Sequence, residues 1–185
     1  MHEVDEQRQF LKLIAKRLDE AGIPYMATGS MAMAVYSVAR MTRDIDVVVA
    51  CDLSQIDRMV ALFAHDCYID RNEVLEAIQS RSMFNVIHNA WVTRADFILR
   101  KNDEYRKLEM ERRRQIDLDD QPVWIVSPED LILSKLVWSK DSRSEMQRRD
   151  VRALLETRTD LDWAYLEKWA QTLSVTEQLE EARLK

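Results

Sequence analysis

The sequence predicts a protein of the α/β class, in which helices alternate with short strands and helices end the chain. Several segments repeat apolar residues at intervals of three and four, which is the period of an amphipathic helix. Between them lie short β-branched runs, above all residues 44–50, that alternate between two faces as a strand does. With 185 residues, 46% hydrophobic and 32% charged, the chain has the composition of one soluble globular body with two lobes.

Charge and hydropathy exclude several classes of protein. The longest uncharged stretch, 23–39, is too short and too mixed to span a bilayer, and the amino terminus lacks a signal sequence, so we expect a cytoplasmic protein with no membrane partner. A net charge of −6 argues against a surface built throughout for nucleic acid. Residues 100–114 and 135–152 are nevertheless net basic, either as solvated helix faces or as surfaces that approach phosphates.

In the first half of the chain, the apolar stripe that begins near Val4 predicts a helix, and Gly22 is placed to end it. The β-branched run after Asp44 predicts the strand that follows a short second helix. The predicted elements are a helix over 4–21, a strand over 25–28, a helix over 31–39, a strand over 44–50, and helices around 56–63 and 74–78.

In the second half, the segment that begins at Ser127 carries a strong helix start, with serine as the cap, proline in the first turn and Asp130 three residues after the cap. His88 stands in the predicted turn of a hairpin, where an ordinary surface histidine is expected. The predicted elements are strands over 83–88 and 91–99, a helix over 103–115, a strand over 122–126, helices from 127, over 144–157 and over 161–173, and a polar tail over 174–185.

Gly29 and Ser30 open the predicted second helix directly after a strand. The chain has only two glycines, so each is expected where a side chain is not tolerated. A helix amino terminus after a tight turn presents unpaired N–H groups and a partial positive charge. These two residues therefore predict a phosphate cradle.

Asp44 and Asp46 begin the strand that follows. The period of two places both carboxylates on one face, while Ile45 and Val47 point the other way. Two carboxylates so close are costly without a neutralising cation, and their oxygens suit Mg²⁺ held together with substrate phosphates. The pair predicts a metal site beside the cradle.

Asp96 lies within an apolar strand, where a carboxylate is expensive unless it is paired or binds metal. The alternative to a metal role is an ion pair with Arg94 or Arg100 at the edge of the sheet. Lys135 lies on the apolar stripe of the helix that Ser127 opens, and Asp150 flanks an apolar face of the next helix. Lys135 can neutralise an anion, or it can simply pair with Asp150.

These motifs resemble those of nucleotidyltransferases of the DNA polymerase β-like superfamily, in which Gly-Ser at a helix start precedes Asp-x-Asp and a third carboxylate. More specifically, the ordered set resembles bacterial nucleotidyltransferase-like proteins related to the AbiEii toxins of type IV toxin–antitoxin systems. It comprises Arg40-x-Thr42-x-Asp44-Ile45-Asp46, the block 127–136 and the Arg149-Asp150 helix. The resemblance implies a short mixed sheet flanked by helices, with a nucleotidyltransferase core over 1–126 and a helical subdomain over 127–185.

The resemblance also implies roles for the site residues. Asp44, Asp46 and Asp96 would be the catalytic carboxylates and the ligands of two Mg²⁺ ions. Gly29, Ser30 and Lys135 would contact the nucleoside triphosphate, and Asp150 would orient Lys135 or the acceptor.

Two functions follow from the resemblance. One is transfer of a nucleoside monophosphate from a nucleoside triphosphate to a hydroxyl of tRNA, a protein or a small molecule. The other is an inactive nucleotide-binding or regulatory module, with a cognate toxin or antitoxin chain as partner.

Overall fold

The computed structural model describes residues 3–37, 44–142 and 144–184. Its first half contains α1 (Glu3–Glu20), β1 (Tyr25–Ala27), α2 (Gly29–Tyr36), β2 (Asp44–Val49), α3 (Ile56–Phe63), β3 (Cys67–Tyr68), α4 (Arg71–Ser80), β4 (Met83–His88) and β5 (Arg94–Leu99). Its second half contains α5 (Glu104–Glu111), β6 (Arg114–Leu118), β7 (Gln121–Ile125), α6 (Pro128–Ser142), α7 (Glu145–Thr157), α8 (Trp163–Thr172) and α9 (Thr176–Arg183). The motif positions Arg40 and Thr42 lie outside the described residues.

The seven strands form one mixed sheet in the order β3-β4-β5-β2-β1-β7-β6. Strand β2 runs parallel to β5 and antiparallel to β1, and β1 runs parallel to β7. The outer pairs, β3 with β4, β4 with β5 and β6 with β7, are antiparallel. The predicted α/β class with a short mixed sheet is therefore confirmed.

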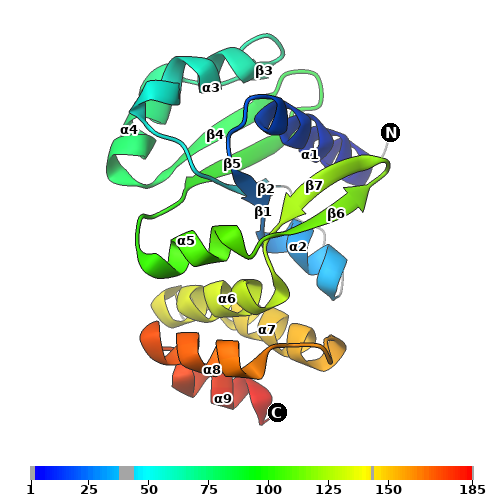
Figure 1. Cartoon of the computed structure of the whole chain (residues 1–185). Coiled ribbons are helices and arrows are strands. Elements are labelled where there is room, and N and C mark those ends of the chain that lie inside the picture. The colour runs from blue at the N-terminus through cyan, green and yellow to red at the C-terminus, as the bar shows by residue number, and fades with distance from the viewer. Residues whose placement is uncertain (1–2, 38–43, 143, 185) are drawn as a thin grey trace.

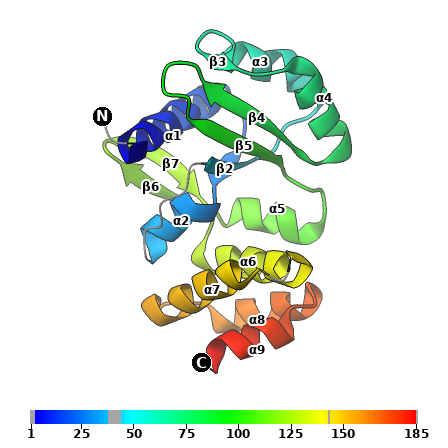
Figure 2. The ribbon, with the colours of Figure 1, turned by 180° about the vertical axis from the view of Figure 1, so that it is seen from behind.

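Helices cover both faces of this sheet. Figures 1 and 2 show α1, α3 and α4 on one side and α5 to α9 on the other. The first side holds a core that includes Phe10, Phe63 and Phe97 together with Ile45 and Val47 of β2. A second core joins α2 and α5 to the helices after β7. Because the two faces of β2 serve different layers, the even-numbered residues of this strand point toward the second layer.

The last four helices pack on one another and, through α6 and α7, on α2. Their position below the sheet is clear in both views (Figures 1 and 2). The division of the chain into 1–126 and 127–185 stays a prediction. The prediction of a polar tail over 174–185 is wrong for most of that segment, because helix α9 forms there. Leu179 of α9 is 1% exposed and packs into the second core. One buried leucine on a short, highly charged helix gives too weak a pattern to be found by periodicity.

Two strands, β6 and β3, were not predicted from the sequence. The helix expected over 103–115 ends at Glu111, and β6 begins at Arg114. Strand β6 lies at the edge of the sheet, where charged residues are tolerated, and it turns into β7 through Asp119 and Asp120, both at positive φ. The short edge strand β3, at Cys67, was likewise not predicted.

His88 is buried, not at the surface as expected. Its ring stacks on Trp91 with centroids 3.8 Å apart, and burial lowers its pKa. No helix within the described ranges is long and apolar enough to cross a membrane.

Candidate functional site

Strand β2 places the two predicted carboxylates on the same side of the sheet. Ile45 and Val47 are fully buried in the first core, and Asp44 and Asp46 face the opposite side. In the parallel pairing with β5, Asp46 stands beside Asp96 and Asp44 beside Arg94. The register therefore brings the third predicted carboxylate next to the pair, although Asp96 lies 50 residues further along the sequence.

Gly29 begins α2 in contact with the Asp46 carboxylate. Its φ of +58° belongs to the left-handed region, and an added Cβ would overlap Oδ2 of Asp46 and lie 2.9 Å from its Cγ. The Thr28 N–H donates to the Asp46 carbonyl at 2.9 Å, which fixes the turn against β2. The absence of a side chain is thus required twice, by the backbone angle and by the approach of the carboxylate.

Asp96 is held by Arg94. The guanidinium donates from Nε to Oδ1 at 2.6 Å and from Nη2 to Oδ2 at 3.1 Å, and Asp96 is 8% exposed. The Arg94 pKa is raised, first by this bond and also by the charges of Asp96, Asp44 and Asp46. The ion pair with Arg94, one of the two readings of Asp96, is therefore present.

The donors at this place fit Mg²⁺ in one particular way. Among the described residues, no three side chains of His, Cys, Asp or Glu are gathered so that they could hold a metal ion by themselves. Asp44 and Asp46 offer hard carboxylate oxygens on one side of the cavity, and the turn at Gly29, where a phosphate cradle is predicted, adjoins them. Mg²⁺ is commonly bound through one or two carboxylates together with substrate phosphates, which suits such a half-built site.

Helix α6 forms the opposite wall and is firmly anchored at its start. The Ser127 hydroxyl accepts from the Asp130 N–H at 3.1 Å and donates to the Asp130 carboxylate at 2.6 Å, so the predicted cap is present. Asp130 also accepts from the Tyr165 hydroxyl at 2.6 Å, and Arg112 lies 3.4 Å away. These buried contacts fix the helix that carries Lys135 toward the carboxylates.

Lys135 is 5% exposed and bonded to α7. Its ammonium donates to Asp150 at 2.7 Å and to the Gln147 side-chain oxygen at 2.9 Å. The predicted Lys135 to Asp150 pair is therefore present. Lys135 and Gln147 line the cavity, whereas Asp150 lies behind Lys135 and does not.

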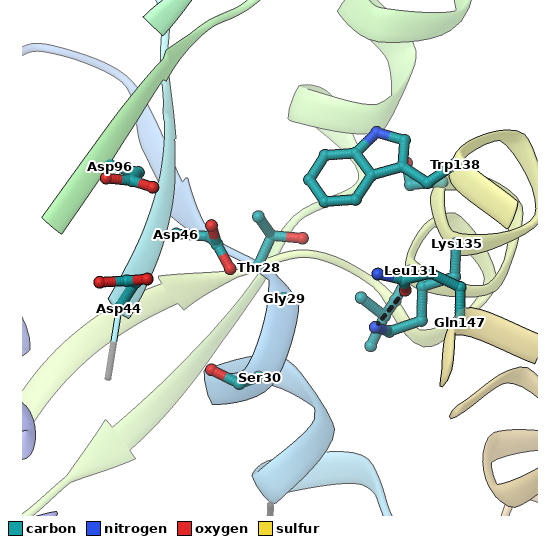
Figure 3. A pocket seen from close by; sticks show the side chains of 11 residues that line it. Thr28, Gly29, Ser30, Asp44, Asp46, Asp96, Leu131, Lys135, Trp138 and Gln147 are labelled. Carbon is teal, nitrogen blue, oxygen red and sulfur yellow. Dashed lines mark hydrogen bonds between the residues drawn. The ribbon is translucent and has the colours of Figure 1, made fainter. Parts of the chain in front are cut away.

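A cavity of about 200 Å³ joins these groups. Figure 3 shows Asp44, Asp46 and Asp96 on one side, the start of α2 with Ser30 below, and Lys135 with Trp138 on the far side. Of the seven predicted site residues, all but Asp150 line this cavity. Five further residues line the cavity and were not predicted as site residues from the sequence: Thr28, Leu131, Ser134, Trp138 and Gln147.

Trp138 is the most informative of the missed residues. The helical period of the segment from Ser127 places Trp138 on the apolar side of α6, but 47% of its surface is exposed and it lines the cavity. The pattern could not separate a core position from a cavity wall, because both are apolar. Lys135, one turn earlier on the same helix, was the available signal that this face meets a polar site.

Comparison with known proteins yields structural neighbours only. No family model matches the chain, and no curated protein matches it. A nucleotidyltransferase-like protein from Paracoccidioides brasiliensis superposes with a TM-score of 0.56 at 15% identity, covering 95% of this chain and 93% of that one. The antibiotic-resistance factor ANT(2″)-Ia, solved with adenylyl-2″-tobramycin, gives 0.55 at 14% identity, covering 97% and 99%.

The lincosamide antibiotic adenylyltransferase LnuA, solved with lincomycin, gives a TM-score of 0.53 at 14% identity, covering 83% of this chain and 98% of that one. At these identities the likeness concerns the fold. The chain has a nucleotidyltransferase fold, as the resemblance implied.

Proposed function

We propose that this protein is a Mg²⁺-dependent nucleotidyltransferase that moves a nucleoside monophosphate from a nucleoside triphosphate to a hydroxyl group. The observation that carries the proposal is the contact between Gly29 and Asp46. It joins the amino terminus of α2, which favours phosphate, to the carboxylates, which favour a cation. A phosphate and its metal ion would thus be held at one place.

Different residues of the site bind the phosphates, neutralise their charge and hold the metal ion. The backbone at Gly29 and Ser30 binds phosphate oxygens, and Lys135 faces them across the cavity and neutralises their charge. Asp150 keeps the Lys135 ammonium in place from behind. Mg²⁺, one or two ions bound at Asp44 and Asp46, would supply charge stabilisation to the attacking and leaving oxygens.

Asp46 and Asp96 stand where the first cavity meets a second, larger one, because both residues line both spaces. A triphosphate in the first space and an acceptor in the second would meet at these carboxylates. The acceptor hydroxyl then approaches the α-phosphorus from the side opposite the departing pyrophosphate, which is the in-line geometry of nucleotidyl transfer. We propose tRNA, a protein side chain or a small molecule as acceptor, and an AbiEii-like place in a toxin–antitoxin or defence system.

The test is a calorimetric titration of the protein with each of the four nucleoside triphosphates in Mg²⁺. Asp44→Ala with Asp46→Ala should abolish Mg²⁺-dependent binding and transfer of the labelled α-phosphate. Glu73→Ala with Glu76→Ala is the matched control, because it removes two exposed carboxylates of α4 that line neither this cavity nor the adjoining one. Transfer retained by the Asp44→Ala/Asp46→Ala variant would refute the assignment.

The second candidate function is a nucleotide-binding or regulatory module without turnover. The bidentate bond from Arg94 to Asp96 favours it, because both oxygens of the predicted third metal ligand already accept hydrogen bonds from a cation. Arg94→Ala separates the two functions. It leaves a buried carboxylate without its guanidinium, which costs about 1–3 kcal/mol of stability.

Under the enzymatic proposal, Mg²⁺ with a nucleoside triphosphate should raise the melting temperature of Arg94→Ala more than that of the wild type, because the ion now neutralises Asp96. An equal rise in both proteins would show that Asp96 does not reach the ion. Together with triphosphate binding and no transfer of label, that result would favour the regulatory module.

A further inference from the structure

A second cavity, of about 490 Å³, adjoins the first one and lies between β5, α5 and α6. Thr28, Ser134 and Trp138 line both spaces, as do the two carboxylates at the junction. Its volume falls within the range of pockets that take small molecules, about 300–1,000 Å³. Under the proposed function, on which this inference rests, this is where the acceptor would bind.

One part of this second cavity is apolar. Val48 and Ile98, on adjacent strands of the sheet, line it together with Met83, which is 44% exposed. Trp138 adds an aromatic surface from α6. An acceptor therefore gains by burying a hydrocarbon or ring portion here.

The other part is cationic. Arg81, Arg100 and Lys101 line it, the last two directly after β5 ends. Across the part of the chain that the structure describes, neither Arg100 nor Lys101 forms a side-chain hydrogen bond or ion pair, while the Arg81 guanidinium donates to the Cys51 carbonyl at 3.3 Å. These positive charges are thus left for a ligand.

Two carboxylates of the same cavity, Glu109 and Asp96, accept hydrogen bonds from neighbouring side chains of the protein. Glu109 is 3% exposed and accepts from Arg106 and from the Ser134 hydroxyl at 2.9 and 2.8 Å. Asp96 is bound by Arg94. Away from the metal-binding edge, the wall of the cavity therefore carries a net positive charge, in a chain whose net charge is −6.

We propose that the acceptor is a small anionic molecule that carries a hydroxyl group and an apolar portion. Its negative group binds at Arg100 and Lys101, its apolar portion lies along Met83 and Ile98, and its hydroxyl reaches the junction. The hydroxyl oxygen bonds to the α-phosphorus, the bond from that phosphorus to the bridging oxygen breaks, and pyrophosphate leaves with that oxygen. The hydroxyl proton passes to a carboxylate at the junction.

The charge beyond the cavity favours a small anion over an extended polyanion. Asp103 and Glu104, both exposed, follow Lys101 after one intervening residue. A long nucleic acid leaving the cavity here would meet negative charge, whereas a small anion would end within the cationic part. A polycationic acceptor would be repelled at the wall itself.

The experiment uses three naphthalene compounds that differ in charge: 1-naphthyl phosphate, 1-naphthalenemethanol and 1-naphthylmethylammonium. Each is titrated by calorimetry into the full chain in Mg²⁺ with a non-hydrolysable nucleoside triphosphate analogue, which fills the first cavity and its carboxylate edge. We expect the phosphate to bind about tenfold or more tightly than the ammonium, because two neighbouring cations favour the anion and oppose the cation.

The variants assign that preference to the cavity. Arg100→Ala with Lys101→Ala should reduce it to about threefold or less, and Arg58→Ala with Lys107→Ala should retain it, since those exposed cations lie outside both cavities. Circular dichroism checks that each variant is folded.

Three results would overturn the inference. One is a preference for the ammonium or no preference, and another is a preference that survives in Arg100→Ala/Lys101→Ala. The third is a short RNA that displaces the naphthyl phosphate at equal or lower concentration, which would identify an RNA acceptor instead. No binding of the analogue would refute the proposed function itself, so the two failures are distinguishable.

Discussion

Substitution of Gly29 by alanine tests the physical argument for the site most directly. A non-glycine residue at φ +58° costs about 1–2 kcal/mol. The added Cβ would also lie 2.9 Å from the Asp46 Cγ, whereas ordinary contacts begin at 3.4 Å, and it would overlap Oδ2. The carboxylate must therefore move by about 1 Å, a displacement that can lower a reaction rate on the order of 100-fold.

Gly22 offers a matched control. Its φ is +63°, and an added Cβ would meet nothing within 4 Å. Gly22→Ala should therefore show the same cost of about 1–2 kcal/mol in urea unfolding, with unchanged transfer of labelled nucleotide. Gly29→Ala should show that cost together with the loss of rate and of Mg²⁺-dependent triphosphate binding. If Gly29→Ala bound and reacted like Gly22→Ala, contact between the turn and Asp46 would have no part in the site.

Two further predictions concern ion pairs. Lys135→Ala should weaken triphosphate binding about tenfold or more, while Asp150→Ala, which does not alter the cavity wall, should weaken it less. In urea unfolding, the double variant should show a coupling free energy of about 1–3 kcal/mol between the two substitutions. Additive effects of the two substitutions would argue against the pair. The Arg17 guanidinium lowers the Asp66 pKa from 3.8 to about 2, so the stabilisation is full above the unfolded pKa and is lost as pH falls from 3.8 to about 2. The Asp66 side chain is 32% exposed, so after solvent screening the ion pair contributes about 1 kcal/mol to the free energy of unfolding. Arg17→Gln should remove this acid dependence, and an unchanged acid unfolding profile in that variant would contradict the prediction.

The elements that the sequence predicted well are those with local causes. The Ser127 cap bonds as its spacing indicates, and Gly22 ends α1 with positive φ. The alternation along β2 places Asp44 and Asp46 on one face as expected. Edge strand β6 was missed because its pattern is polar, and α9 was missed because one buried leucine carries its packing.

The site required contacts that no local pattern contains. The register of β2 with β5 sets Asp46 beside Asp96, and it also sets Arg94 within bonding distance of Asp96. Whether Asp96 faced a metal or an arginine was left open by the sequence, because both choices satisfy a buried carboxylate equally well.

By itself, the sequence determined the α/β class, the carboxylate pair on one strand face, and the glycine at the turn where a phosphate cradle is predicted. These depend on side-chain period and backbone angles, which are properties of neighbouring residues. The tertiary structure decided that Lys135 pairs with Asp150, that Trp138 lines a cavity, and that a cationic space lies beyond the carboxylates. Those features depend on the distance between elements remote in sequence, and packing of the whole chain alone sets that distance.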